Sequence, residues 1–294
     1  MYAITGATGN TGRRITEMLL SQGKKIRVIG RDAVRLKPLV DKGAEAFTGS
    51  LDDAAAMTRA FTGAKAVYAM IPPNPITKNL RAYQNQIGEA LATAIAKARV
   101  PFVVNLSSVG GHLSEKVGPV NGLHDQEQRL NQLKDVHVVH LRPGYFMENL
   151  YWSIDLIKKM GINGSPLKPD LPISMIATRD IAGEAVRLLA DLKFTGKSVK
   201  ELMGQRDVTM SEVTLALGRT IGKPDLKYVQ FSYEEAEKAM LGMGLSASVV
   251  KNYIEMYHAF NDGIVKWTEA RSSENTTPTS IEMFAKQFAA AYRG

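Results

Sequence analysis

Short apolar runs alternate with helix-length segments along the first half of this 294-residue chain. The apolar runs predict strands over residues 2–5, 26–29, 44–47, 66–71, 102–106 and 136–141. Between them apolar residues recur at helical spacing, and the longest such segment predicts a helix from about Asn79 to Ala98. Strands that alternate with helices are typical of parallel βαβ units. The pattern therefore predicts an α/β fold with a doubly wound parallel sheet.

The alternation becomes less regular beyond residue 142. A stretch rich in Gly, Pro and Asn over 161–171 precedes a helix that we expect from Thr178 to Ala190. The last hundred residues have the apolar spacing of helices, as at Tyr253, Tyr257 and Phe260. That spacing favours core packing of these three aromatic residues over a role in a substrate pocket. We therefore expect this part of the chain to be mainly helical.

A glycine-rich segment, T-G-A-T-G-N-T-G over residues 5–12, follows the first strand directly and precedes a helix. Gly6 permits a sharp turn, Gly9 lets the backbone approach a pyrophosphate, and Gly12 allows close packing of helix on strand. The N–H groups and dipole at a helix N-terminus favour an anion. The segment therefore predicts a Rossmann-type dinucleotide site, with a tight turn that binds no ligand as the alternative.

The end of the second strand distinguishes the two dinucleotides. An acidic residue there would bind the ribose 2′-hydroxyl of NAD, whereas an arginine accommodates a 2′-phosphate. This chain has Arg31 at that position, and Asp32, one residue later, fits a helix cap. We therefore predict NADP(H) as the cofactor, with a solvated surface arginine as the alternative interpretation of Arg31.

These patterns divide the chain into two expected regions. Residues 1–150 are predicted to form an NADP(H)-binding Rossmann domain, and residues 151–294 a smaller, partly helical C-terminal substrate-binding region. The boundary is soft, because the helix over 178–190 is also suited to pack back on the sheet.

A formal net charge of +8 raises the question of a nucleic-acid partner. Basic residues outnumber acidic ones by 19 to 12 over residues 1–150 and by 18 to 17 over residues 151–294. There is no long basic run and no interleaving of basic with aromatic residues. A scattered positive field suits a phosphorylated dinucleotide, so we expect no nucleic-acid partner.

The remaining composition narrows the chemistry. The chain has no cysteine, and its five histidines show no metal-ligand spacing, so we expect no disulfide and no metal site. No apolar stretch has the length of a membrane span, and the N-terminus does not resemble a signal peptide. We therefore expect a cytoplasmic protein without a membrane partner.

Several segments together resemble the NmrA-like branch of the atypical short-chain dehydrogenases/reductases. They are the glycine-rich segment, N-L-S-S over 105–108, R-P-G-Y-F-M-E-N over 142–149 and P-I-S-M-I-A-T-R-D-I-A over 172–182. The likeness covers residues 1 to about 190 well and the C-terminal hundred residues poorly. This branch includes NADPH-dependent quinone reductases, isoflavone-type reductases and regulators that bind a dinucleotide without evident catalysis. The resemblance therefore implies the fold but leaves the reaction open.

The resemblance also implies a set of cofactor contacts. The residues implied to line the pyrophosphate are Gly6, Thr8, Gly9, Asn10, Thr11 and Gly12. Arg31 would meet the 2′-phosphate, and Leu51 would flank the adenine. Met70 and Ile71 would pass beside the ribose and nicotinamide. The residues implied to cover the nicotinamide carboxamide are Pro143, Tyr145 and Phe146. Topology agrees, since loops at the carboxyl ends of the strands surround the crevice of such a sheet.

Candidate catalytic groups differ from those of typical short-chain dehydrogenases, which use a Tyr-x-x-x-Lys pair. No tyrosine in this chain has a lysine four residues later. The isoflavone-type reductases carry a lysine near the start of the helix after the Ser-rich strand end, and this chain has His124 there. Its His-x-x-Glu spacing resembles the quinone-reductase-like members. Imidazole can donate or accept a proton near neutral pH, so His124 is a catalytic candidate.

Ser107 is the second catalytic candidate, because its hydroxyl lies where it could reach the substrate or the nicotinamide. Each candidate has an alternative interpretation. His124 is equally suited to begin the helix or bind a cofactor ribose, and Ser107 to make a local loop hydrogen bond. The glycines over 109–123 predict a mobile lid beside both residues.

Two functions follow from these features. The leading hypothesis is an NADPH-dependent reductase that transfers hydride to a small electron-poor acceptor, such as an aromatic, quinone-like or enone molecule. An acceptor that forms a stabilised hydroquinone anion needs no strong internal acid, which agrees with the missing Tyr/Lys pair. The alternative is an NADP(H)-sensing regulatory protein without turnover, whose partner would be another protein.

Overall fold

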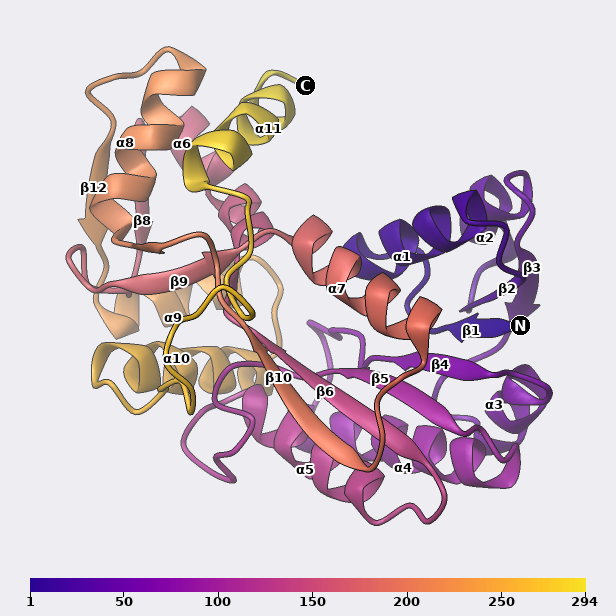
Figure 1. Ribbon diagram of the computed structural model, residues 1–294. Coiled ribbons are helices and arrows are strands. Elements are labelled where there is room, and N and C mark those ends of the chain that lie inside the picture. Colours follow the sequence, from indigo (N-terminus) through magenta and orange to yellow (C-terminus); the bar gives the residue numbers. More distant parts are fainter.

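Seven parallel strands form the main sheet of the computed structural model, which describes residues 1–294 (Figure 1). Their order across the sheet is β10-β6-β5-β4-β1-β2-β3. The strands are β1 (Tyr2–Ile4), β2 (Ile26–Gly30), β3 (Glu45–Thr48), β4 (Ala66–Ala69), β5 (Phe102–Leu106), β6 (His137–Pro143) and β10 (Lys197–Leu202). The chain order reverses between β1 and β4, which is where such sheets bind ligands. The predicted Rossmann-type doubly wound parallel sheet is confirmed.

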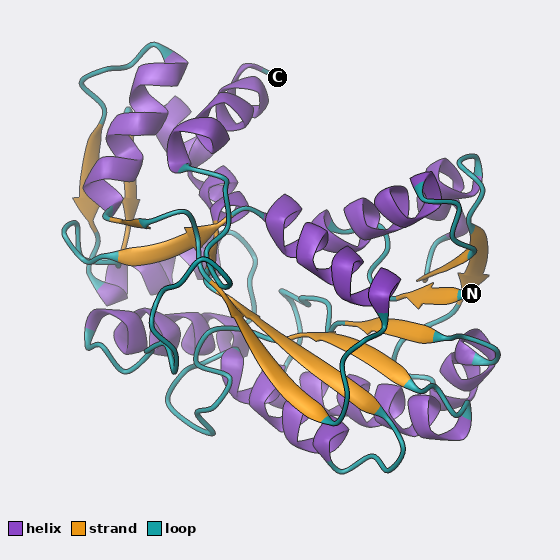
Figure 2. Cartoon of the chain, in the orientation of Figure 1, coloured by secondary structure: helices purple, strands orange, loops and turns teal.

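Helices cover both faces of this sheet (Figure 2). On one face lie α1 (Asn10–Ser21), α2 (Ala33–Val40) and α7 (Thr178–Asp191). On the other lie α3 (Ala54–Phe61), α4 (Leu80–Lys97) and α5 (Val120–Asn131). Successive strand residues point to opposite faces, so Val104 packs into the first core and Val103 into the second. The sheet is therefore buried on both sides, as its continuous apolar strands require.

Side-chain caps explain where several helices begin. The Asp32 carboxylate accepts hydrogen bonds from the N–H groups of Val34 and Arg35, at 2.8 and 3.4 Å, so its predicted capping role is confirmed. Asp53 caps α3, and Asn79 caps α4 through the Ala82 N–H. These caps fix the turns that follow β2, β3 and β4.

A second lobe lies beyond the carboxyl edge of the sheet (Figure 1). Its strands are β7 (Tyr145–Phe146), β8 (Ile162–Ser165), β9 (Ile173–Ile176), β11 (Asp207–Val208) and β12 (Lys227–Gln230). Its helices are η1 (Met147–Ser153), α6 (Ile154–Met160), α8 (Met210–Ile221), α9 (Tyr233–Gly242), α10 (Ala247–Asn261) and α11 (Ile281–Arg293). A third core that includes Phe284 and Phe288 holds much of this lobe together.

The chain returns to the main sheet after entering this lobe. Helix α7 packs beside α1, and β10 then pairs with β6 in parallel. The expectation of a mainly helical C-terminal part missed β10, β11 and β12. Strand β10 is an edge strand with the largely polar sequence K-S-V-K-E-L, so it lacks the apolar run that marks the central strands. We therefore propose that the nucleotide-binding unit comprises residues 1–150 together with 178–202.

A long loop over residues 262–280 ties the two lobes together. The buried carboxylate of Glu201, on β10, accepts hydrogen bonds from the N–H groups of Thr268 and Glu269. The Met203 N–H donates to the Asn275 carbonyl at 2.7 Å. None of the helices is long and apolar enough to span a bilayer.

Candidate functional site

The predicted site residues follow the carboxyl ends of adjacent strands. Because all seven strands run parallel, these ends lie along one edge of the sheet. Read from β3 to β6, the loops carry Leu51, Arg31, the glycine-rich segment, Met70, Ser107 and Pro143. The structure therefore brings the proposed cofactor residues into one row, in the order in which a dinucleotide presents adenine, phosphates and nicotinamide.

The glycine-rich loop has the geometry that its sequence predicts. Gly6 has a φ of +59°, a left-handed conformation that favours glycine. The Gly9 N–H donates to the Gly6 carbonyl at 2.9 Å, which closes the turn. A Cβ on Gly12 would lie 2.4 Å from the Gly6 carbonyl oxygen, so only glycine allows α1 to start this close to β1.

The N-terminus of α1 presents free hydrogen-bond donors. Helix α1 begins at Asn10 without a side-chain cap, unlike the capped α2. The backbone N–H groups of Asn10, Thr11 and Gly12 have no acceptor within the protein. The Thr11 side chain points inward, where its hydroxyl accepts a hydrogen bond from Tyr68 at 3.0 Å. The loop therefore offers backbone donors and a helix dipole, which fit a pyrophosphate.

Arg31 lies exposed after β2 and makes no ion pair or hydrogen bond through its side chain. Its guanidinium is close enough to Tyr83, on α4, to lower the pKa of that hydroxyl, although burial has the larger effect and raises it. The Tyr83 hydroxyl donates to the Pro72 carbonyl in the loop after β4. The Arg31 guanidinium therefore has no partner within the protein, and it lies near Tyr83 in the first turn of α4.

The Met70 side chain lies over the glycine-rich loop, whereas the Leu51 side chain is buried in the core. The Met70 side chain covers the glycine loop, since a Cβ on Gly6 would lie 2.5 Å from the Met70 sulfur. Ile71 follows it and is half-buried. Leu51 is only 9% exposed and packs in the core beneath α3 and α4, so mainly its backbone is available to a ligand.

Ser107 belongs to a buried charged network at the end of β5. Its hydroxyl donates to Glu127 Oε1 at 2.5 Å. Two Arg142 nitrogens donate to the two oxygens of the same carboxylate, at 2.9 and 2.6 Å. Ser107, Glu127 and Arg142 are 3%, 1% and 7% exposed. Since a carboxylate only accepts, the single Ser107 proton is committed, and its oxygen has only lone pairs left for a ligand.

His124 is anchored one turn before Glu127 on α5. Its Nδ1 lies 2.9 Å from the Gly111 carbonyl oxygen. A carbonyl only accepts, so Nδ1 carries the proton and Nε2 is the free ring nitrogen. Nε2 accepts a hydrogen bond when the ring is neutral and donates one when it is protonated. The His-x-x-Glu spacing therefore joins His124 and Glu127 on one helix face.

Glu127 and Arg142 are functional candidates that the sequence reasoning did not assign. Gly111 lies against this network, because a Cβ there would be 2.6 Å from Glu127 Oε1 and 2.9 Å from the Ser107 oxygen. Glu127 thus orients Ser107 directly, and the buried Glu127–Arg142 pair lies against Gly111, whose carbonyl orients His124. The signal in the sequence was the glutamate of His-x-x-Glu on α5, but its partner Arg142 lies on β6.

Two of the glycines in the segment over 109–123, for which we predicted a mobile lid, lie in close contacts. Gly122 packs on Gln84, and a Cβ on Gly118 would lie 2.0 Å from the Asn252 carbonyl oxygen. Val117 and Val120 are buried against Ala259. Gly118 and Gly122 therefore allow close packing of the segment on α4 and α10.

Aromatic residues gather beyond the end of β6. Pro143 is buried at the end of the strand, and Phe146 packs against the core under α1 and α7. The Tyr145 ring meets the Phe260 ring of α10 edge-on, with 6.3 Å between centroids. Burial raises the pKa of Tyr145, so its hydroxyl stays protonated. These contacts place α10 beside the predicted nicotinamide end of the row.

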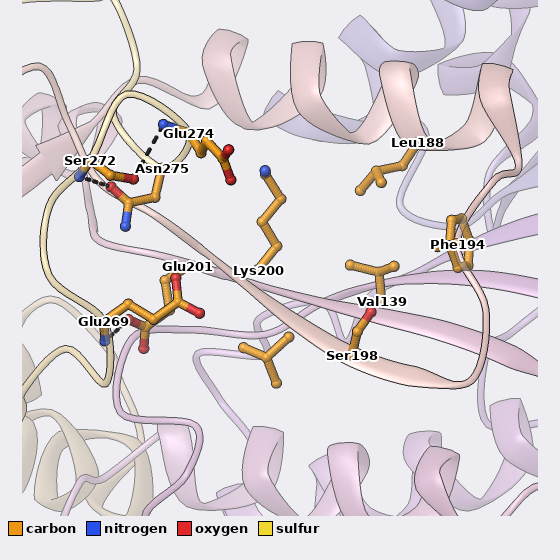
Figure 3. Close-up of a pocket in the computed structure, with 11 residues that line it drawn as sticks. Val139, Leu188, Phe194, Ser198, Lys200, Glu201, Glu269, Ser272, Glu274 and Asn275 are labelled. Carbon is orange, nitrogen blue, oxygen red and sulfur yellow. Dashed lines mark hydrogen bonds between the residues drawn. The ribbon is translucent and has the colours of Figure 1, made fainter.

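A separate hollow of about 270 Å³ lies at the outer edge of the sheet (Figure 3). Residues of β10, among them Lys200, form one wall, and residues of the 262–280 loop, among them Glu274, form the other. Its lining includes none of the predicted cofactor or catalytic residues. The hollow is therefore a seam between loop and edge strand, distinct from the candidate site.

Comparison with known proteins agrees with this geometry. The model of the NmrA-like family matches residues 2–285. The chain belongs to the NmrA-like family. It is 27% identical to an NAD(P)H azoreductase of Xenophilus azovorans, over 87% of this chain and 86% of that protein. It is 26% identical to quinone oxidoreductase 2 of Escherichia coli, over 83% and 82% of the two chains.

Solved structures share the fold of this NmrA-like chain at lower identity. The NADPH complex of an Escherichia coli NADPH-dependent quinone oxidoreductase has a TM-score of 0.83 and 21% identity, over 98% of this chain and 99% of that one. The NADP(H) complex of a Citrobacter triphenylmethane reductase has a TM-score of 0.80 and 19% identity, over 98% and 100%. The likeness extends over both lobes.

Proposed function

We propose that this NmrA-like protein is an NADPH-dependent reductase of small, electron-poor, conjugated acceptors. The observation that carries the proposal is the row of ligand-ready groups at the carboxyl edge of the sheet. Free N–H groups at α1 lie at the switch point of the strand order, and the Ser107 network lies two strands away. The azoreductase and quinone oxidoreductase relatives support the same class of reaction.

The glycine loop would hold the cofactor's pyrophosphate through backbone donors. The backbone N–H groups of Asn10, Thr11 and Gly12 would donate to it, with Thr8 and Gly9 closing the loop around it. When bound, NADPH supplies the hydride. Met70 and Ile71 would then lie beside the ribose, and Pro143, Tyr145 and Phe146 beside the nicotinamide.

Preference for the phosphorylated cofactor follows from two residues after β2. Arg31 is an exposed cation without a partner, which suits a 2′-phosphate. Asp32 is engaged in capping α2, so its carboxylate is not free to bind a ribose 2′-hydroxyl. The pair therefore favours NADP(H) over NAD(H).

The roles of Ser107 and His124 follow from their fixed partners. Ser107 would accept a hydrogen bond from the nicotinamide carboxamide, because its hydroxyl already donates its hydrogen bond to Glu127. His124 would donate to the acceptor through Nε2 when protonated, since Nδ1 is held by Gly111. Hydride transfer adds two electrons and one proton to the acceptor, and His124 or water supplies the second proton.

NADPH oxidation with a panel of quinones, enones and azo dyes tests this proposal. We expect turnover with at least one acceptor class, faster with NADPH than with NADH. A His124→Gln variant should lower kcat, because it removes a proton donor to the acceptor, while Ser107→Ala should raise the Kd for NADPH only a few-fold. Tight, redox-selective NADPH binding with no turnover across the panel would contradict the reductase and favour a sensor.

A further inference from the structure

A half-buried row of aromatic side chains lies along one face of α10. Tyr253 and Tyr257 are one helical turn apart, so they share a face of the helix. Phe260 continues that face and meets Tyr145 of β7. At the other end, Tyr253 packs against a small core that includes Leu80 at the start of α4. The row therefore reaches from the helix that follows β4 to the strand that follows β6.

The adjacent face of α10 is held by the segment before α5. Ala259 is buried against Val117 and Val120, and the Asn252 carbonyl lies directly against Gly118. These contacts fix the rotation of α10 about its axis. The tyrosine face thereby lies between the small core that includes Leu80, at the start of α4, and Tyr145, which follows β6.

The hydroxyls of Tyr253 and Tyr257 have no hydrogen-bond partner in the protein, and neither is sealed from solvent. Two nearby tyrosines, Tyr228 and Tyr83, differ in this respect. Tyr228 donates to the Leu167 carbonyl at 2.7 Å, and Tyr83 donates to the Pro72 carbonyl at 3.0 Å. Two hydroxyls on the same face that solvent reaches and that no protein group engages are free to donate to an acceptor atom of a ligand.

Both hydroxyls remain protonated near neutral pH. Burial raises the pKa of Tyr253, and burial together with the nearby Tyr145 and Tyr253 hydroxyls raises the pKa of Tyr257. Neither group is then a base under ordinary conditions. They are therefore hydrogen-bond donors.

We infer that the Tyr253 and Tyr257 hydroxyls bind the acceptor by donating hydrogen bonds to a carbonyl oxygen of a planar conjugated molecule. This inference rests on the proposed reductase function and names the acceptor chemistry. The Tyr145 and Phe260 rings form the wall on which such a molecule stacks. As hydride adds to the conjugated system, negative charge grows on the carbonyl oxygen, and the two hydroxyls stabilise it. This assigns to α10 the donor role that the missing Tyr-x-x-x-Lys pair plays elsewhere.

The test uses a matched pair of aromatic probes, xanthone and xanthene, of which only xanthone carries a carbonyl. Calorimetry of the full chain with NADP⁺ present would give their dissociation constants. We expect Tyr253→Phe and Tyr257→Phe each to weaken xanthone binding about 3- to 10-fold, and to leave xanthene binding unchanged. Tyr292→Phe, at the end of α11, is the control and should change neither constant.

Folding does not confound these variants, because each removes a hydroxyl that has no partner. Their Tm values should equal that of the wild type, whereas Tyr228→Phe should lower the Tm by breaking its bonds to Ser165 and Leu167. Equal xanthone affinity in wild type and the Tyr253→Phe/Tyr257→Phe double variant would overturn the inference. So would no wild-type binding of xanthone, or an equal loss for both probes.

These outcomes separate the inference from the proposed function. If no acceptor is turned over but xanthone binding depends on the hydroxyls, the reductase proposal fails and the site stands. If quinones are reduced at wild-type kcat/KM by the double variant, the reductase stands and the inference fails.

Discussion

The two ends of the sheet-edge site are built in different ways. The phosphate end comes from seven consecutive residues, Gly6 to Gly12, and its donors are backbone N–H groups. The opposite end gathers side chains from separate elements: Ser107 after β5, Glu127 on α5 and Arg142 on β6. Helix α10, more than a hundred residues farther along, adds its tyrosines.

This difference determines how each end tolerates change. A backbone cradle depends on the absence of side chains, so a single added methyl group disrupts it. A side-chain network depends on buried partners, so its weak point is the loss of one charge. The four predictions below probe these two kinds of construction.

The largest effect is expected at the buried pair. Glu127→Gln removes the charge that pairs with Arg142, and losing one partner of a buried ion pair costs about 3–5 kcal/mol. Urea denaturation would measure the free energy of unfolding. The control, Glu89→Gln, breaks the exposed pair with Arg129 and should cost less than about 1 kcal/mol. Equal losses in the two variants would contradict the claim that the side-chain end depends on a buried charge.

At the phosphate end, Gly12→Ala should reduce NADPH affinity by more than about 100-fold, or roughly 3 kcal/mol. The added Cβ would lie 2.4 Å from the Gly6 carbonyl oxygen, so the loop must open. Quenching of protein fluorescence by NADPH would measure the affinity. Gly183→Ala on α7, where the added Cβ meets nothing within 4 Å, should bind NADPH as the wild type does.

The free energy of unfolding is expected to depend on pH through His140, which is buried near the side-chain end of the site. His140 is buried between Asn105 of β5 and Asn131 of α5, and burial lowers its pKa to about 4. Above pH 6.5 the residue is neutral in both folded and unfolded chains, so stability is full. As the pH falls from about 6.5 to 4, only the unfolded chain gains this proton, and up to about 3 kcal/mol is lost.

Chemical denaturation at several pH values would measure this loss. His140→Gln should flatten the dependence between pH 6.5 and 4, whatever its effect on stability at neutral pH. A wild-type slope unchanged by the substitution would show that other groups are responsible.

The smallest effect is expected at the cofactor's 2′-phosphate. Arg31→Ala should weaken NADPH binding about 10- to 100-fold, as the loss of a charge-assisted contact predicts, and leave NADH binding unchanged. Arg35→Ala, which removes an exposed arginine on α2, is the matched control. An equal loss for both dinucleotides would mean that Arg31 supports the loop itself.

The contrast between one continuous segment and side chains gathered from separate elements also explains what the sequence could predict. The fold, the capping role of Asp32 and the conformation of the glycine loop depend on short segments, so local patterns were sufficient for them. Strand β10 was missed because an edge strand needs no apolar run. The Glu127–Arg142 pair joins residues of different elements, and no spacing rule reports it.

The α10 tyrosines show what helical spacing in the sequence cannot predict. Helical spacing favoured core packing of Tyr253, Tyr257 and Phe260 over a pocket role, and these rings do pack against apolar clusters. Spacing carries no information on whether a hydroxyl finds a partner after folding. That question depends on β7, α4 and the segment before α5, which come together only in the tertiary structure.

The central claim is that the carboxyl edge of this sheet binds a phosphorylated dinucleotide. Titration calorimetry of the full chain with NADPH and with NADH tests it most directly. We predict one site per chain, with NADPH bound at least about 10-fold more tightly than NADH. Absence of heat-detected binding with either dinucleotide, in a protein shown to be folded, would contradict the account.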